Sequence, residues 1–140
     1  MFSGFTQTTR TFTPKNPCDA IMFKNPVMYL LELKSTKGTS FSFSDKIIKQ
    51  HQIDDLTKAS TYNGLLPFFI FNFRKYNETY GIHITDFIKF KDSTTKKSIN
   101  RDDCIKIGIL IEQKIKKVKY HYRIDKFVKD SEEKYLHKEE

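Results

Sequence analysis

Two carboxylates and one amine are spaced so that a short hairpin would bring them together. Asp19 follows Asn16-Pro17-Cys18, and Glu32 and Lys34 come at the end of an apolar run further along the chain. Oxygen ligands of this kind favour Mg²⁺ or Mn²⁺ over zinc. A metal bound between them would polarise a phosphodiester and lower the pKa of a bound water, and Lys34 would position that water or stabilise developing charge. The residues therefore point to metal-dependent phosphodiester hydrolysis.

The elements that must position these residues are two predicted strands, 19–24 and 27–34, joined through Asn25-Pro26. A loop of two or of four residues gives the same register, in which paired residue numbers sum to 51 and Asp19 lies opposite Glu32. Opposed residues share a face with Cβ atoms about 4.5–5.5 Å apart, and strand alternation adds Lys34 to that face. Opposed carboxylates destabilise a sheet unless a cation lies between them. A loop of odd length would separate the pair.

The alternative interpretation makes Asp19 a turn residue and makes Glu32 and Lys34 an exposed strand pair, because short motifs often match by chance. Residues 27–31, just before Glu32, are nearly all apolar and predict a buried strand. A charged pair at the end of such a strand is less ordinary than one on a polar surface, so the site interpretation is kept beside the alternative.

Gln52 adds a polar group to the candidate site. It lies on the apolar stripe of a predicted helix, together with Ile48, Leu56 and Ala59. We expect it to point inward over the same sheet, where a buried amide needs polar partners. The alternative is a glutamine that bonds only to the backbone of its own helix.

The rest of the chain predicts further elements around this hairpin. We expect a helix over 44–60 with Ser44 as its N-cap, and helical turns from Thr85 and near Ser98 or Asn100. Further strands are expected over 65–73, 78–84, 104–111 and 118–123, with a C-terminal helix or tail over 124–140. With 1–16 irregular and no repeat or linker, the sequence predicts a single α/β domain over 1–140, built on a mixed β-sheet flanked by helices.

The composition of the chain indicates the kind of molecule it binds and the cellular compartment in which it acts. The net charge is +8 and the sequence pI about 9.4, which favours a polyanion such as nucleic acid. The two cysteines, Cys18 and Cys104, are too few for a disulfide framework and lack metal-ligand spacing, so free thiols are expected. With neither a signal peptide nor a membrane-spanning run, we expect a cytoplasmic protein. Most of the aromatic residues fall in apolar strands and are expected in the core.

Basic residues gather in the second half of the chain. Between Lys89 and Lys126 there are 12 Lys or Arg against 5 Asp or Glu. The densest cluster is Lys114, Lys116, Lys117, Lys119 and Arg123. This cluster is predicted to bind phosphate, with a solvated basic face as the alternative. The basic residues expected to contact nucleic acid near the candidate site are Arg10, Lys15, Lys37 and Arg74.

Several motifs follow one another in a fixed order. They are Asn16-Pro17-Cys18-Asp19, Leu31-Glu32-Leu33-Lys34-Ser35, Thr39-Ser40-Phe41, His51-Gln52-Ile53 and Phe69-Ile70-Phe71-Asn72-Phe73-Arg74. In these motifs the chain resembles the RecU-type Holliday-junction resolvases of the PD-(D/E)xK nuclease superfamily. The likeness covers roughly residues 10 to 105 and implies a restriction-endonuclease-like core.

The resemblance also implies an activity: Mg²⁺-dependent cutting of four-way DNA junctions by a homodimer, in recombination and repair. Asp19 and Glu32 match the metal-binding carboxylates, and the Leu33 carbonyl would be a further metal ligand. Lys34 matches the catalytic lysine, and Gln52 matches a glutamine on the helix that follows the core strands. A two-fold dimer would present one active site to each cut strand.

The chain departs from the family pattern at one point. The family has a further metal-ligand Glu on an N-terminal helix, whereas the 18 residues before Asp19 contain no acidic residue. Two alternatives to the resolvase therefore stay open. One is a weakened junction-binding protein or a fragment that lacks the upstream Glu, and the other is a nuclease of the same superfamily that acts on duplex DNA.

Overall fold

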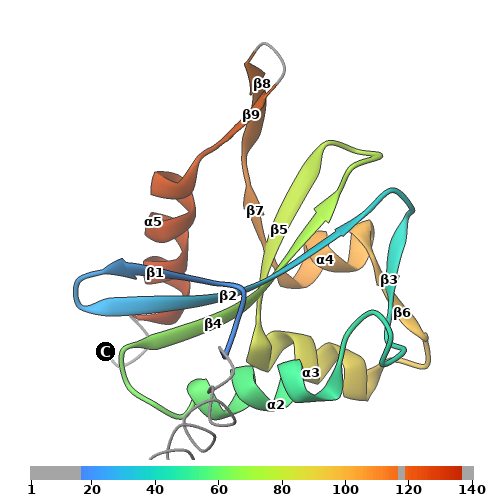
Figure 1. The fold of residues 1–140 in the computed structure, drawn as a ribbon, viewed down its shortest axis with the longest axis horizontal. Helices are drawn as coiled ribbons and strands as arrows, with labels where there is room; N and C mark the ends of the chain where they lie inside the picture. Colours follow the sequence, from blue (N-terminus) through green and yellow to red (C-terminus); the bar gives the residue numbers. More distant parts are fainter. Residues whose placement is uncertain (1–16, 117–118, 137–140) are drawn as a thin grey trace, which may run out of the picture.

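The computed structural model describes residues 17–116 and 119–136. Its centre is a five-stranded sheet with strand order β1-β2-β4-β5-β7 (Figure 1). The strands are β1 (Ala20–Lys24), β2 (Val27–Thr36), β4 (Leu65–Phe73), β5 (Glu78–His83) and β7 (Ile109–Ile111). Only β2 and β4 are parallel among the neighbouring pairs of this sheet. The predicted mixed α/β sheet flanked by helices is confirmed.

The crossover between the parallel strands β2 and β4 contains β3 (Ser40–Ser42) and α2 (Gln50–Ala59). A parallel connection needs such a crossover, and its helix must pack on one face of the sheet. Leu56 of α2 is fully buried in the same cluster as Phe69, Phe71 and Phe73 of β4. Helix α2 thus lies on the sheet face that carries the even-numbered residues of β2, including Leu30.

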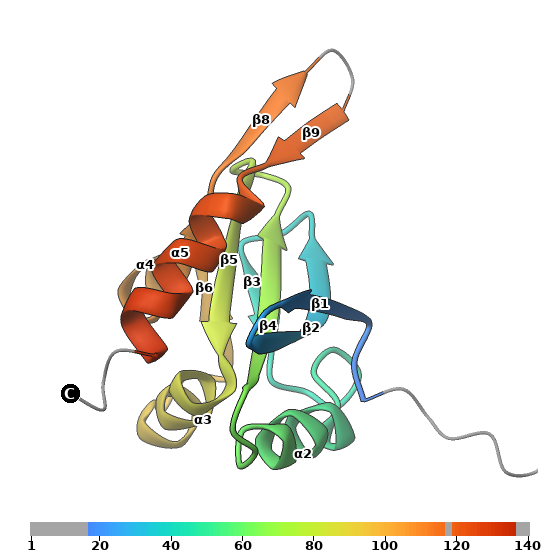
Figure 2. The same cartoon turned by 90° about the vertical axis from the view of Figure 1, so that its left-hand side faces the viewer.

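The other face of the sheet packs against α5 (Ile124–Tyr135). Tyr29, Phe68 and Phe127 form one aromatic group there, with ring centroids 5.2–6.0 Å apart. Figure 2 shows α5 along this side of the sheet, with α2 and α3 (Ile84–Ser93) together at one end. Alternation along β4 therefore divides its apolar residues between two cores, and the expected aromatic core is confirmed at these positions.

The predicted helix over 44–60 was wrong at its start, because α2 begins only at Gln50. The carbonyl of Ser44 accepts from the N–H groups of both Ile47 and Ile48 at 3.0 Å, which closes a single turn that does not continue. The side chain of Asp45, which lies outside the helix, accepts from the N–H of Gln50 at 2.9 Å. The Asp45 carboxylate, which lies before α2, thus accepts a hydrogen bond from the first residue of the helix.

The predicted strand over 104–111 was also wrong. Residues Arg101–Ile107 form helix α4, and only the last part of the segment is strand, as β7. The Asn100 side chain accepts from the N–H of Asp103 at 2.9 Å, and the Asp103 side chain accepts from the N–H of Asn100 at 3.0 Å. This capping box continues the turn that was expected near Asn100 into a helix, in spite of the isoleucines.

The other expected elements are found with shifted limits, and some strands were not expected. The turn from Thr85 is the ten-residue helix α3, and the C-terminal helical pattern is α5. Strands β3 and β6 (Ser98–Asn100) form a small separate sheet. Strands β8 (Gln113–Lys116) and β9 (Lys119–Tyr122) form a two-stranded ribbon, of which only β9 was predicted. Among the described residues, no helix is long and apolar enough to span a membrane.

Candidate active site

The hairpin of β1 and β2 has the predicted register. Its pairs run from Lys24↔Val27 to Ala20↔Leu31, so paired residue numbers sum to 51 along the whole ladder. Asn25 and Pro26 form the two-residue turn. Glu32 and Lys34 are therefore at the end of β2 that extends beyond β1, on the face covered by α2.

Asp19 leaves this register at the last step. Its N–H donates to the carbonyl of Leu31 at 3.1 Å, and its carboxylate Oδ2 accepts from the N–H of Leu33 at 3.0 Å. The Asp19 carboxylate thus takes the place of a backbone partner at the free edge of β2. Because the N–H and C=O of one strand residue point to the same side, the Leu33 carbonyl is also directed towards the edge where Asp19 lies.

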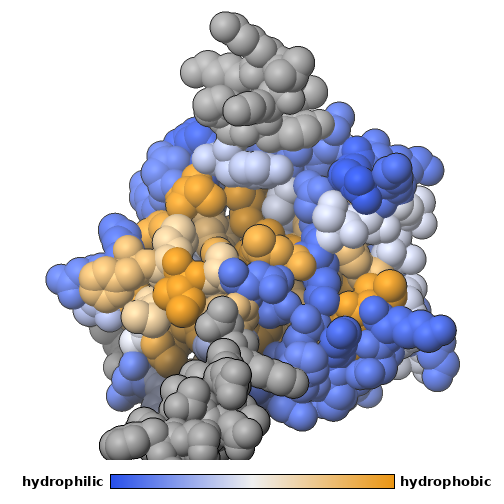
Figure 3. Space-filling view, viewed as in Figure 1, coloured by the Kyte–Doolittle hydropathy of each residue, from blue (hydrophilic) through white to orange (hydrophobic). Residues whose placement is uncertain are grey.

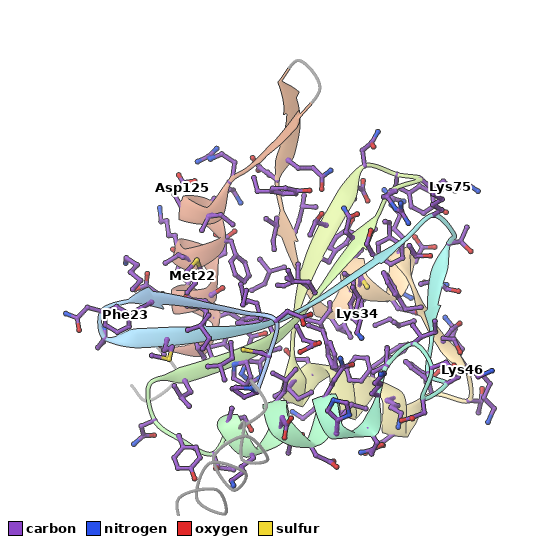
Figure 4. The ribbon with its side chains drawn as sticks, in the orientation of Figure 1. Met22, Phe23, Lys34, Lys46, Lys75 and Asp125 are labelled. Carbon is purple, nitrogen blue, oxygen red and sulfur yellow. The ribbon has the colours of Figure 1, made fainter. Side chains whose placement is uncertain are left out.

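Glu32 is almost completely buried, with 3% of its surface exposed. Its Oε1 accepts from Nε2 of Gln52 at 2.7 Å, and Oε1 of Gln52 accepts from Nζ of Lys34 at 2.8 Å. The same Gln52 oxygen accepts from the N–H of Lys49 at 3.2 Å, which fixes the amide at the start of α2. The expectation that Gln52 points inward over the sheet is confirmed, and Figure 4 shows Lys34 in the middle of the molecule, beside β2.

The pKa values of Glu32 and Lys34 are shifted from their ordinary values. Burial, and secondly the neighbouring Asp19 carboxylate, raise the pKa of Glu32 from its ordinary 4.5 to about 7, against a smaller opposing effect of Lys34. Burial lowers the pKa of Lys34, and Glu32 and Asp19 partly offset this. A buried carboxylate next to a second carboxylate is destabilised as an anion, so a cation bound between them would be favoured.

The residues present fit a divalent metal of the magnesium type. Asp19 is exposed and Glu32 buried, and both line an open pocket of about 250 Å³ together with Pro17, Cys18, His51, Gln52 and Asp55. Mg²⁺ is usually bound through one or two carboxylates and keeps several waters or substrate phosphates. Residues 17–116 and 119–136 contain no group of three or more His, Cys, Asp or Glu that would hold a metal by themselves. The candidate donors for such a metal are the carboxylates of Asp19 and Glu32 and the backbone carbonyl of Leu33.

Two of the four predicted basic contacts lie close to one another. The N–H of Arg74 donates to the carbonyl of Thr36 at 3.0 Å, so Arg74 lies beside the end of β2. Lys37 is the next residue after Thr36 in the chain. Both side chains are exposed, and Lys37 is three residues beyond Lys34. The other two contacts, Arg10 and Lys15, lie outside the described residues.

Asp55 and Cys18 are pocket residues that sequence reasoning did not assign to the site. Asp55 lies three positions after Gln52, a spacing that puts both on one side of α2. This spacing in the sequence could have indicated that Asp55 lies near the site. Cys18 is a buried free thiol and burial raises its pKa, so it is a weak nucleophile.

Comparison with known proteins shows the family of this chain. The family model described as "RecU: Recombination protein U" matches residues 7–126. The SPbeta prophage-derived uncharacterized protein YotM of Bacillus subtilis (strain 168) is 38% identical over an alignment of 125 residues, and the match covers 80% of this chain. The match spans 64% of the length of that relative. Because the family model matches most of its length, the chain belongs to the RecU family.

Proposed function

We propose that the protein is a Mg²⁺-dependent endonuclease that resolves four-way DNA junctions in recombination and repair. The observation that carries the proposal is the buried Glu32 carboxylate beside Asp19, tied through Gln52 to the Lys34 amine. A buried carboxylate beside a second carboxylate is costly unless a cation lies between them. Membership of the RecU family supports DNA recombination as the setting.

Each side chain has a separate part in the proposed reaction. Mg²⁺, or Mn²⁺ in its place, would supply a polarised phosphodiester and a more acidic water when bound. Asp19, Glu32 and the Leu33 carbonyl would hold it, with Asp19 facing solvent and the incoming phosphate. Lys34 would stabilise the negative charge that develops on the phosphate, and Gln52 would hold both Lys34 and Glu32 in place. Lys37 and Arg74 are proposed to bind the DNA backbone next to the cut, with Arg10 and Lys15 as further candidates.

We infer that the active form is a homodimer in the cytoplasm, since a symmetric junction needs two equivalent cuts. An apolar groove of about 370 Å³ on the α5 side of the sheet supports a protein contact there. Among its lining residues, Leu33 is 50% exposed, Tyr122 43% and Ile124 41%. Figure 3 shows hydrophobic residues gathered over this part of the surface, around β1, β2 and α5.

The test is cleavage of an immobile four-way junction and of a linear duplex in about 10 mM Mg²⁺, enough to fill a weak carboxylate site. EDTA controls run beside both substrates, and binding is measured in the same samples. Asp19→Asn is compared with Asp92→Asn, a matched change of an exposed carboxylate on α3. We expect paired nicks in the junction, absent in EDTA and in Asp19→Asn but retained in Asp92→Asn.

Other outcomes would favour the alternatives. Tight junction binding without cutting by the wild-type protein would contradict the enzyme and favour a binding protein. Equal cutting of junction and linear duplex would favour a duplex nuclease of the same superfamily.

A further inference from the structure

Asp55 carries a third carboxylate beside the candidate active site. It lies on α2 and lines the same pocket as Asp19 and Glu32. Its side chain is exposed and makes neither a hydrogen bond nor an ion pair with the described part of the chain. The adjacent Asp54 is also exposed, but it does not line the pocket, and its carboxylate accepts from Nε2 of Gln50 at 2.9 Å. Because adjacent helix residues do not face each other, only Asp55 of the two is directed to the site.

Pairing within α2 does not account for the position of Asp55. His51 lies one turn before it, at the i, i+4 spacing that brings helix side chains together, and lines the same pocket. No ion pair joins these two residues, which both belong to the described chain. A third negative charge in a pocket that already holds Asp19 and Glu32 is unfavourable by itself, because like charges repel. A cation in the pocket would remove this cost.

Asp55 is not placed as a third direct ligand of such a cation. The residues that the structure describes contain no group of three or more His, Cys, Asp or Glu that could hold a metal, so Asp19, Glu32 and Asp55 do not close around one ion. The direct donors are then Asp19, Glu32 and the Leu33 carbonyl. Octahedral Mg²⁺ takes more ligands than these, and it usually keeps several waters.

The pocket has room for these waters on the side of Asp55. Its volume is about 250 Å³, and one water takes about 30 Å³, so several waters fit between the direct donors and Asp55. Water around an ion needs hydrogen-bond acceptors, and a carboxylate at this position both accepts such bonds and attracts the ion. The Gln52 amide oxygen is already used, because it accepts from Nζ of Lys34 and from the N–H of Lys49.

We propose that Asp55 is a positioning residue for the metal of the candidate active site, which it holds through water rather than by direct coordination. The inference rests on the proposed function for the presence of the metal, and it adds the residue that fixes the hydrated side of the ion. Asp55 would determine how tightly the ion is bound, whereas Lys34 would act on the phosphodiester.

The test is Mn²⁺ binding in the absence of DNA, followed through the electron paramagnetic resonance signal of free Mn²⁺. Mn²⁺ is the probe because it takes the same oxygen ligands as Mg²⁺. Asp55→Asn is compared with Asp54→Asn, which removes the same charge from the neighbouring position of α2, and with Asp55→Glu, which keeps the carboxylate. Urea unfolding in EDTA checks the fold of each variant. The Mg²⁺ concentration that gives half-maximal junction cleavage is measured for all of them.

We expect Asp55→Asn to raise the Mn²⁺ dissociation constant and the half-maximal Mg²⁺ concentration by about 10-fold. The reason is that groups around the direct ligands contribute about 10- to 100-fold to metal affinity. Asp54→Asn should change both values by less than about 2-fold, because an exposed charge outside the pocket is screened. Asp55→Glu should restore most of the affinity, and all three variants should unfold at the same urea concentration as the wild type in EDTA.

Several results would overturn this role of Asp55. They are an unchanged Mn²⁺ affinity in Asp55→Asn, an equal loss in Asp54→Asn, or a loss in Asp55→Asn as large as in Asp19→Asn, which would make Asp55 a direct ligand. Failure of the proposed function has a different signature, which is Mn²⁺ binding by the wild-type protein without cutting of either junction or duplex. Absence of Mn²⁺ binding by the wild type would overturn both.

Discussion

Replacing Glu32 by glutamine should stabilise the metal-free protein and lower its cleavage rate. The carboxylate is 3% exposed and its pKa is raised from 4.5 to about 7, chiefly by burial. The folded state therefore holds this proton more tightly than the unfolded state. The contribution of Glu32 to the free energy of unfolding is therefore most favourable below about pH 4.5, falls as the pH rises from about 4.5 to about 7, and levels off above that.

The size of the effect follows from the two pKa values. A carboxyl group whose pKa moves from 4.5 to about 7 on folding costs about 3 kcal/mol of stability once it is ionised in both states. Between pH 5 and pH 7 the loss is about 2 kcal/mol. In Glu32→Gln the amide oxygen still accepts from Gln52 and its NH₂ group faces the Asp19 carboxylate, so the variant avoids this penalty without leaving a polar group unpaired.

The assay is urea unfolding in EDTA at pH 5 and pH 8 for the wild-type protein, for Glu32→Gln and for Glu133→Gln, an exposed control on α5. We expect Glu32→Gln to exceed the wild type by about 2 to 3 kcal/mol at pH 8 and by less than about 1 kcal/mol at pH 5. Adding Mg²⁺ should then stabilise only the proteins that keep Glu32. A Glu32→Gln protein that is less stable than the wild type at pH 8, or that keeps the same pH dependence, would refute the reasoning.

The remaining predictions concern the site, the core, one helix start and the proposed dimer interface. Lys34→Met should lower the cleavage rate by about 10²–10³ with unchanged junction affinity, because it removes charge stabilisation and not DNA binding; gel-shift and cleavage assays on the same samples check this. Phe69→Ala, at a fully buried ring stacked on Phe71, should cost about 3–5 kcal/mol in urea unfolding. Asn100→Ala removes the cap of α4 and should cost about 1 kcal/mol, whereas Asn100→Asp should keep most of that stability. Ile124→Lys should turn a dimer into a monomer in light scattering, and a monomeric wild-type protein would remove the proposed interface.

Part of the site could be predicted from the sequence because local rules determine it. The two-residue turn at Asn25-Pro26 sets the register of the hairpin, and the alternation of β2 places Glu32 and Lys34 on one face. Gln52 could be predicted to point inward, because it interrupts an otherwise apolar helical stripe. Its two partners follow once α2 packs over β2.

The rest depends on competitions that a linear pattern does not settle. The isoleucines of residues 104–111 favour a strand, but the capping box at Asn100 stabilises a helix over the first part of this segment. Asp19 leaves the ladder because its carboxylate accepts from the N–H of Leu33, a side-chain bond that no register predicts. The pairing of β8 with β9 depends on strands of four residues each, which are too short for a clear alternation.

Single-turnover cleavage of prebound junction DNA tests whether Asp19, Glu32 and Lys34 form a metal-dependent nuclease site. Wild-type protein and Glu32→Gln are saturated with four-way junction in EDTA, and excess Mg²⁺ starts the reaction. We expect equal binding, cutting by the wild type only after Mg²⁺ is added, and a rate lower by about 10³ in Glu32→Gln, since metal stabilisation supplies several kcal/mol. Equal cleavage rates in the two proteins, or cutting by the wild type in EDTA, would contradict it.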